Sequence, residues 1–227
     1  MNRTVVSLLS ARSVVLFGAM ILALALIALS LGTSARQADA ATRLVTKTFT
    51  NSGQILIRAD AVLPECTTSV SGPATPYPSE KNVTFPSGSH IRDVNLTLKN
   101  YTHTFPDDVD VLLKKGTHNR TVMSDVGSNE DVSNITLVLN DEATSALPDD
   151  VGLVGGSFKP RNVEDNPDGG DQFPAPAPTQ DTRSALSGFD TLNPNGTWKL
   201  FVQDDGGGDC GKFGGGWSLR IKAAVPA

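Results

Sequence analysis

Two acidic clusters contain the residues whose type and spacing could bind a metal ion. They are Asp107, Asp108 and Asp110 in PDDVD, and Asp204, Asp205 and Asp209 in QDDGGGDCG. Hard cations such as calcium bind carboxylate and carbonyl oxygens, often from loops at strand ends. Neither cluster has the spacing of an EF-hand. Two interpretations therefore remain: a calcium site, or solvated turn aspartates that accept hydrogen bonds from their own backbone and need no cofactor.

A catalytic constellation is not recognisable in this sequence. It contains no G-x-S-x-G, H-E-x-x-H or C-x-x-C motif, and its only histidines are His90, His103 and His118. His103 could act as a base with Asp107 or Asp108 behind it, but a base without a nucleophile does not make a hydrolase. We therefore expect His103 to be a structural residue at a strand end, and we assign no catalytic residue.

The first forty residues are typical of an export signal. Arg3 and Arg12 accompany an apolar run from Ser13 to Leu31, and Ala38-Asp39-Ala40 has the small-x-small pattern of a signal-peptidase site. This pattern predicts a cleaved signal peptide over 1–40. The alternative is an uncleaved membrane anchor, because the apolar run is long enough to span a bilayer. Either reading places the remainder outside the cell or at its surface.

Both cysteines of the chain, Cys66 and Cys210, follow this signal. Export makes a disulfide between them chemically permissible. Two separate thiols are the alternative, because the sequence does not fix the distance between the two Cα atoms.

The composition excludes one class of partner. The chain has 19 basic and 24 acidic residues and a net charge of −5, so it offers no basic face for nucleic acid. Hydrophobic residues make up 39% of the chain, which is enough for a real core. A membrane is a partner only if the N-terminal segment stays uncleaved.

Period-two alternation dominates the sequence after residue 41 and predicts β-strands that would position the acidic loops. The expected strands are 93–99, 108–114, 134–140, 197–203 and 216–222, with weaker ones at 54–60 and 81–85. Turn-forming residues separate them, which is typical of a β-sandwich or jelly roll. We expect one domain over 41–227.

Two interruptions of this pattern have their own interpretations. Residues 160–185 are rich in proline and glycine and are expected to form a long surface loop, with FPAPAP as extended, polyproline-like chain. A short helical turn is expected at 141–146.

Two stretches resemble the P domain, also called the Homo B domain, of proprotein convertases and related bacterial subtilisin-like proteases. They are SHIRDVNLTLKNYTHTFPDDVDVLLKKGTHNRTVMSDVG and NGTWKLFVQDDGGGDCGKFGGGWSLRI, and the resemblance extends over roughly 47–223. It implies a jelly-roll β-sandwich of the galactose-binding-like type. In that family the domain follows a catalytic domain and stabilises it. The sequence departs from the family in that no protease domain precedes the similar part.

The resemblance also suggests structural roles for individual residues. His103 and Thr104 are similar to a His-Thr pair that would tie the following loop to the sheet, and Asp108 and Asp110 to the acidic position after that pair. Two further residues would be core tryptophans, namely Trp198 and Trp217. None of these roles is catalytic.

Three functions fit these observations. The first is a secreted, non-catalytic module that binds or stabilises an extracellular partner, such as a subtilisin-like serine protease. The second is a component of a serine-type endopeptidase whose catalytic residues lie on another chain. The third is a structural or adhesive surface protein. The missing nucleophile favours the first, with no enzymatic activity expected of the chain alone.

Overall fold

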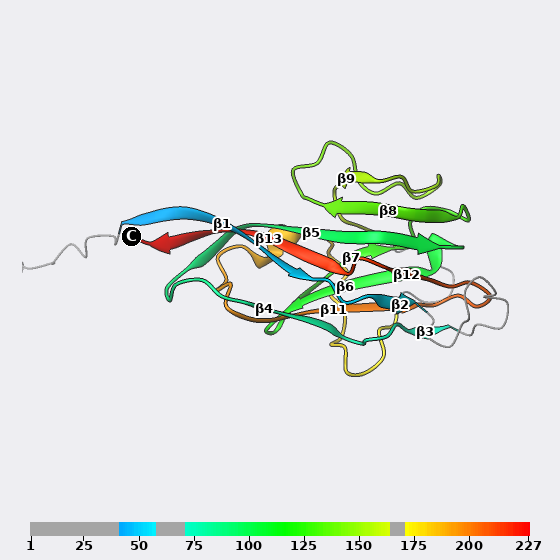
Figure 1. Ribbon diagram of the computed structural model, residues 1–227, viewed down its shortest axis with the longest axis horizontal. Helices are drawn as coiled ribbons and strands as arrows, with labels where there is room; N and C mark the ends of the chain where they lie inside the picture. Colours follow the sequence, from blue (N-terminus) through cyan, green and yellow to red (C-terminus); the bar gives the residue numbers. More distant parts are fainter. Residues whose placement is uncertain (1–40, 58–70, 164–170) are drawn as a thin grey trace, which may run out of the picture. The chain divides into compact units, whose positions relative to one another are not determined.

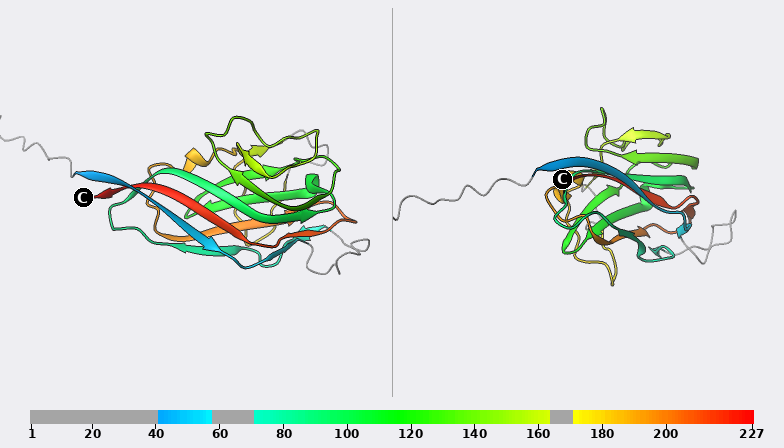
Figure 2. Two further views of the ribbon diagram at one scale, coloured as in Figure 1. Left: turned by 45° about the horizontal axis from the view of Figure 1, so that its top comes forward. Right: turned by 60° about the vertical axis from the view of Figure 1, so that its left-hand side comes forward.

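The described part of the chain is an all-β sandwich. The computed structural model describes residues 41–57, 71–163 and 171–227, and residues 41–227 form one compact unit. Two mixed sheets pack face to face, as Figures 1 and 2 show. The prediction of an all-β sandwich is therefore confirmed. The expected signal peptide lies outside the described residues and stays a prediction, and no helix within those residues is long and apolar enough to cross a membrane.

The first sheet has seven strands, arranged around the long strand β5. It contains β1 (Thr42–Asn51), β2 (Ile55–Ile57), β5 (His90–His103), β8 (Val132–Leu139), β9 (Gly156–Phe158), β12 (Gly211–Phe213) and β13 (Trp217–Pro226). One edge of β5 pairs with β13 and then with β12, and its other edge pairs with β8. All pairs in this sheet are antiparallel except β8 with β9.

The second sheet has six strands, and β11 is shared among three neighbours. It contains β3 (Gly72–Pro73), β4 (Ser79–Val83), β6 (Val109–Lys115), β7 (His118–Ser124), β10 (Arg161–Asn162) and β11 (Gly196–Asp204). Strand β6 lies between β11 and β7, and β10 joins the edge of β7 in parallel. Two short 3-10 helices, η1 (Pro106–Asp108) and η2 (Leu186–Phe189), lie outside the sheets.

The alternating apolar residues of the sequence form the core between the sheets. Their side chains are at most 3% exposed in β5, β6, β11 and β13, as the following residues show: Val94, Leu96, Leu98, Val109, Val111, Leu113, Trp198, Leu200, Val202, Trp217, Leu219 and Ile221. Burial of this apolar area drives folding. The polar ends of both tryptophans are satisfied, because the Trp198 indole N–H donates to the Pro194 carbonyl and the Trp217 indole N–H donates to the Ser79 hydroxyl.

Strand β7 has no period-two alternation, because both of its faces are covered. Its outer face lies under the proline-rich segment 171–185, which buries the polar residues Asn119 and Thr121. The Asn119 amide donates to the Thr179 carbonyl, and the Thr121 hydroxyl donates to the Gln180 side chain. A strand whose polar residues are buried by a loop cannot be recognised from alternation alone.

Two local expectations are wrong. Residues 141–145 form turns and bends instead of a helical turn, and Ala146 forms a β-bridge with Lys159. The stretch FPAPAP is not continuously extended, because the Ala177 N–H donates to the Pro174 carbonyl across a turn. The physical reason is that the segment bends back over β7, where its backbone finds hydrogen-bond partners.

The two tryptophan strands do not form a hairpin. Strand β11 belongs to the second sheet and β13 to the first, so the glycine-rich connection between them passes from one layer to the other and contributes β12 on the way. The loops at this end lie opposite the end where Ala41 and Ala227 meet, joined by a hydrogen bond from the Ala227 N–H to the Ala41 carbonyl (Figure 1).

Candidate functional site

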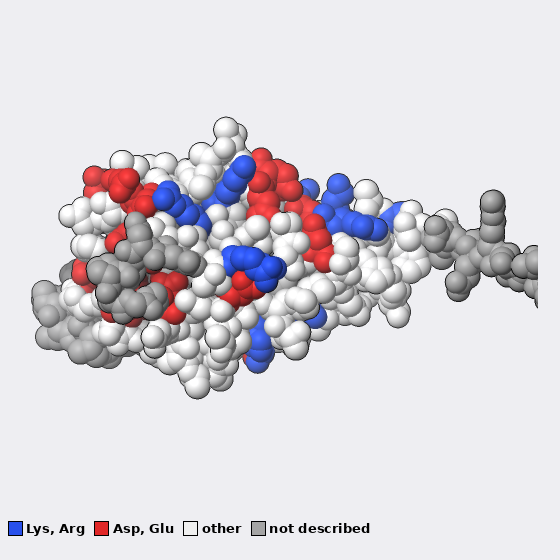
Figure 3. All heavy atoms as spheres, turned by 180° about the vertical axis from the view of Figure 1, so that it is seen from behind, with Lys and Arg blue, Asp and Glu red and all other residues white. Residues whose placement is uncertain are grey.

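Aspartates from several strand ends gather at one end of the sandwich, which we call the acidic end. It comprises Asp107, Asp108, Asp110, Asp125, Asp171, Asp204, Asp205 and Asp209. These residues come from η1, the start of β6, the end of β7, the segment that begins at residue 171, and the end of β11 with the loop after it. In Figure 3 acidic side chains border the grey segments at the left of the molecule.

The two acidic clusters of the sequence meet in space. The Asp205 N–H donates to the Asp108 carbonyl at 3.0 Å, which ties the β11–β12 loop to η1. A Cβ at position 206 would overlap the Asp108 carboxylate, so Gly206 permits this close approach. Partial burial, followed by repulsion from Asp204, Asp205 and Asp209, raises the pKa of Asp108 to about 7.

Asp110 is the most deeply buried carboxylate of the predicted first cluster. It lies opposite Gln203 in the β6–β11 register and is 1% exposed. The Gln203 amide donates to Asp110 Oδ2 at 3.1 Å, whereas buried Oδ1 accepts no hydrogen bond. Burial and then the nearby charges of Asp171 and Asp205 raise the pKa of Asp110 well above its ordinary value. The hydrogen bond from Gln203 opposes this shift without cancelling it.

Asp110 converges with two carboxylates that the sequence did not indicate. One oxygen from each of Asp110, Asp125 and Asp171 lies within 4.8 Å of the others. Asp125 follows β7 with a φ of 49°, a left-handed conformation that aspartate tolerates. Burial, together with repulsion from Asp171, raises the pKa of Asp125 to about 7, although a hydrogen bond from Ser124 lowers it. Asp171 is 6% exposed.

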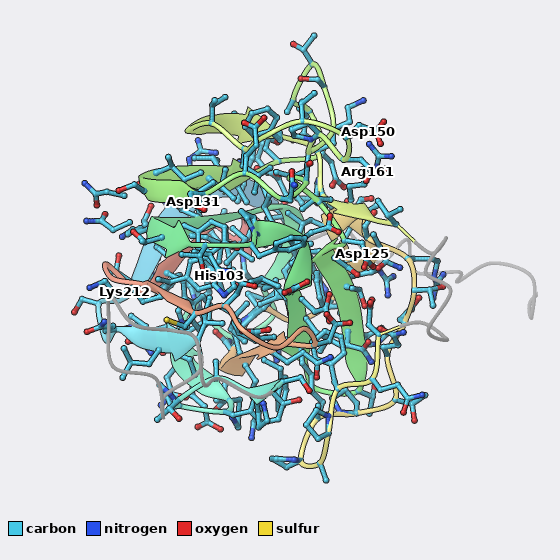
Figure 4. All side chains as sticks on the ribbon, turned by 90° about the vertical axis from the view of Figure 1, so that its right-hand side faces the viewer. His103, Asp125, Asp131, Asp150, Arg161 and Lys212 are labelled. Carbon is cyan, nitrogen blue, oxygen red and sulfur yellow. The ribbon has the colours of Figure 1, made fainter. Side chains whose placement is uncertain are left out.

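His103 is sealed in the interior. It is completely buried, its Nδ1 lies 2.9 Å from the Phe105 carbonyl oxygen, and its Nε2 lies 3.5 Å from Oδ2 of the equally buried Asp204. Figure 4 looks onto the acidic end, with His103 between the layers and Asp125 at the right. A histidine in this position holds the β5–β6 connection against the end of β11.

Thr104 connects the same turn to the β11–β12 loop. Its hydroxyl donates to Asp209 Oδ1 at 2.8 Å and accepts from the Cys210 N–H at 3.3 Å. Cys210 is buried and disulfide-bonded. Its expected partner, Cys66, lies outside the described residues, so the pairing stays a prediction. Asp209 therefore has a structural contact that does not depend on a metal ion.

Arg120 fixes the proline-rich segment that contains Asp171. It is 7% exposed, and its Nη1 lies 2.7 Å from Oδ2 of Asp181. Its Nε donates to the Ala185 carbonyl at 3.2 Å, and its guanidinium lies 5.8 Å from the ring centroid of Phe189. These contacts hold the 181–185 part of the segment against β7.

Two pockets of about 280 Å³ each adjoin the acidic end. The first is lined by Ser71, Gly72, Gln172, Pro174, Gln203, Asp204 and Asp205, and the second by Asp171, Gln172, Phe173, Ala177, Pro178, Thr179 and Gln180. Neither lining contains a histidine or a cysteine. The pockets offer hydroxyl, amide and carboxylate groups that can form hydrogen bonds with a ligand.

The comparisons with known proteins do not assign the chain to a family. No protein-family model, no curated protein and no solved structure matches it. The resemblance to P domains therefore stays a prediction that depends on the sequence stretches themselves.

Proposed function

We propose that this chain is an exported, non-catalytic module that binds or stabilises an extracellular protein partner. The observation that supports it most is the burial of His103 and Asp204, each 0% exposed. A general base must reach the proton it removes from a substrate. This histidine-acid pair cannot do so without opening the sandwich, so it serves the fold.

The other two described histidines, His90 and His118, form no hydrogen bond with the side chain of a serine, threonine or cysteine. His90 is exposed, and its Nδ1 lies 3.0 Å from the Thr191 backbone oxygen. His118 is exposed at the start of β7, next to the turn after β6. A triad is recognised by all of its roles together, and these positions supply none of them. The second candidate is a component of a serine endopeptidase whose catalytic residues would be supplied from elsewhere.

The acidic end is the surface that we assign to the partner. Loops from both sheets meet there, and Asp107 and Asp205 present carboxylates at its surface, so a partner surface with lysine or arginine would be attracted to it. Such attraction increases the association rate more than the final affinity, and it weakens with salt. The described chain ends, Ala41 and Ala227, meet at the opposite end of the sandwich, away from these carboxylates (Figure 1).

The experiment has two parts, activity and binding. The purified chain should neither hydrolyse labelled casein nor react with a fluorophosphonate serine-hydrolase probe. Crosslinking in the exported fraction of its host should recover a protein that, once purified, binds the chain with salt-sensitive affinity. A variant with Asp107→Asn and Asp205→Asn should bind more weakly, whereas a control with Glu142→Gln and Asp150→Asn should not. Hydrolysis by the pure chain, or equal binding by both variants, would contradict the proposal.

A further inference from the structure

One buried carboxylate oxygen at the acidic end, Oδ1 of Asp110, has no hydrogen-bond donor. Oδ1 of Asp110 is buried and accepts no hydrogen bond, although the other oxygen of the same carboxylate accepts one from Gln203. An unsatisfied buried polar atom is costly, and a buried carboxylate is more so unless it is paired, hydrogen-bonded or bound to a metal ion. A proton or a cation bound at Oδ1 would therefore stabilise the Asp110 carboxylate.

The geometry around Asp110 favours a cation. Carboxylate oxygens of Asp110, Asp125 and Asp171 lie within 4.8 Å of one another. Calcium–oxygen distances are about 2.3–2.6 Å, so two ligands of one calcium ion lie at most about 5 Å apart. Among the described residues, this is the one group of three or more acidic, histidine or cysteine side chains whose ligand atoms converge so closely.

We propose that Asp110, Asp125 and Asp171 together bind one calcium ion. The ligands come from β6, from the residue after β7 and from the segment over β7, so the ion would join three parts of the chain. The donor set is made of oxygen only, which suits calcium and excludes a structural zinc site built on cysteine or histidine. Calcium also accepts irregular geometry with backbone carbonyls and water as further ligands, whereas magnesium requires a near-ideal octahedron.

This site differs from the one that the sequence suggested. Of the six predicted ligands, only Asp110 belongs to it, and the other two ligands are Asp125 and Asp171. Asp209 already accepts a hydrogen bond from Thr104. Asp171 lines one of the pockets of about 280 Å³, so one of the three proposed ligands borders an open pocket.

The test is calcium binding by the full chain after treatment with EDTA. Isothermal titration calorimetry should give one calcium ion per chain. At a calcium concentration 100 times the Kd, the Tm should rise by about 5–10 °C, as expected when a ligand binds only the native state of a domain this size. Magnesium at the same concentration should raise the Tm by less. No binding heat together with an unchanged Tm would overturn the proposal.

Variants locate the ion. Asp110→Asn and Asp171→Asn should each weaken calcium binding at least tenfold, because each removes a charged ligand. Asp131→Asn is the matched control, since Asp131 is an exposed aspartate labelled in Figure 4 and should bind calcium like the wild type. Asp171 lies outside the sheets, so its variant gives a readout even if Asp110→Asn does not fold. Normal binding by Asp171→Asn, with loss in Asp108→Asn, would place the ion elsewhere and contradict the assignment.

Discussion

The imidazole Nε2 of His103 lies 3.5 Å from Oδ2 of Asp204, and both side chains are completely buried. His103 ends β5 in the first sheet and Asp204 ends β11 in the second, so this contact joins the two layers at the acidic end. Because both side chains are buried between the sheets, we assign this histidine–aspartate contact a structural role.

Replacement of His103 should therefore destabilise the protein. His103→Gln removes the buried imidazole that faces the Asp204 carboxylate, which should reduce the free energy of unfolding by about 3 kcal/mol. Urea denaturation followed by tryptophan fluorescence measures this change. His90→Gln, at an exposed histidine, should change it by less than about 0.5 kcal/mol. Equal effects of the two variants would contradict a structural role for the buried pair.

Arg120 and Arg183 both contact Asp181, but they should contribute very differently to stability. Arg120 is buried and also bonds backbone carbonyls, whereas the Arg183 side chain is 73% exposed. Arg120→Met should reduce the free energy of unfolding by about 3 kcal/mol. Arg183→Met should have a much smaller effect, because solvent screens its exposed ion pair. Limited proteolysis should cut residues 171–185 faster in Arg120→Met alone. Similar cleavage in both variants would show that the exposed arginine also anchors the segment.

The pH dependence of the same contact has a defined sign. Hydrogen bonds from Arg183, together with the charge of Arg120, lower the pKa of Asp181 to about 2. A carboxyl whose pKa is lowered on folding adds stability above its unfolded pKa, about 4, and that stability is lost as the pH falls through about 2. The difference in unfolding free energy between wild type and Asp181→Asn should thus shrink between pH 4 and pH 2. A constant difference over this range would contradict the ion pairing.

The disulfide is tested by mass spectrometry of the exported protein. Cys210 is disulfide-bonded, and the sequence contains one other cysteine, Cys66. Alkylation without reductant should add no label, and alkylation after reduction should add two. Cys210→Ser should lower the free energy of unfolding by about 2–5 kcal/mol. Two labelled thiols in the unreduced protein would refute the bridge.

The fold was largely predictable because its core strands alternate clearly. Apolar residues such as Leu96 and Leu200 occupy every second position of their strands. This alternation indicates that one face of each strand is buried. Strand β7 was missed because the segment over it buries polar side chains such as Asn119 and Thr121, and burial of this kind depends on tertiary contacts. The pairing of β11 and β13 with different sheets also depends on long-range packing, which local patterns do not contain.

The candidate site was predictable only in part, for a similar reason. Asp110 belongs to the acidic stretch PDDVD, which by itself suggests a metal site. Asp125 stands in SDVG and Asp171 in DGGDQ, where single aspartates are ordinary turn residues. They become candidate ligands only because the end of β7 and the segment that begins at residue 171 lie next to Asp110 in the fold. No spacing within the sequence could have indicated that convergence.

The most direct test of the calcium assignment is a crystal structure of the exported chain grown with calcium, with anomalous scattering used to locate the ion. A single anomalous peak is predicted at about 2.3–2.6 Å from oxygens of Asp110, Asp125 and Asp171. A structure in which these three carboxylates face one another without an ion, while calcium occupies the loop of Asp205 and Asp209, would contradict the calcium assignment.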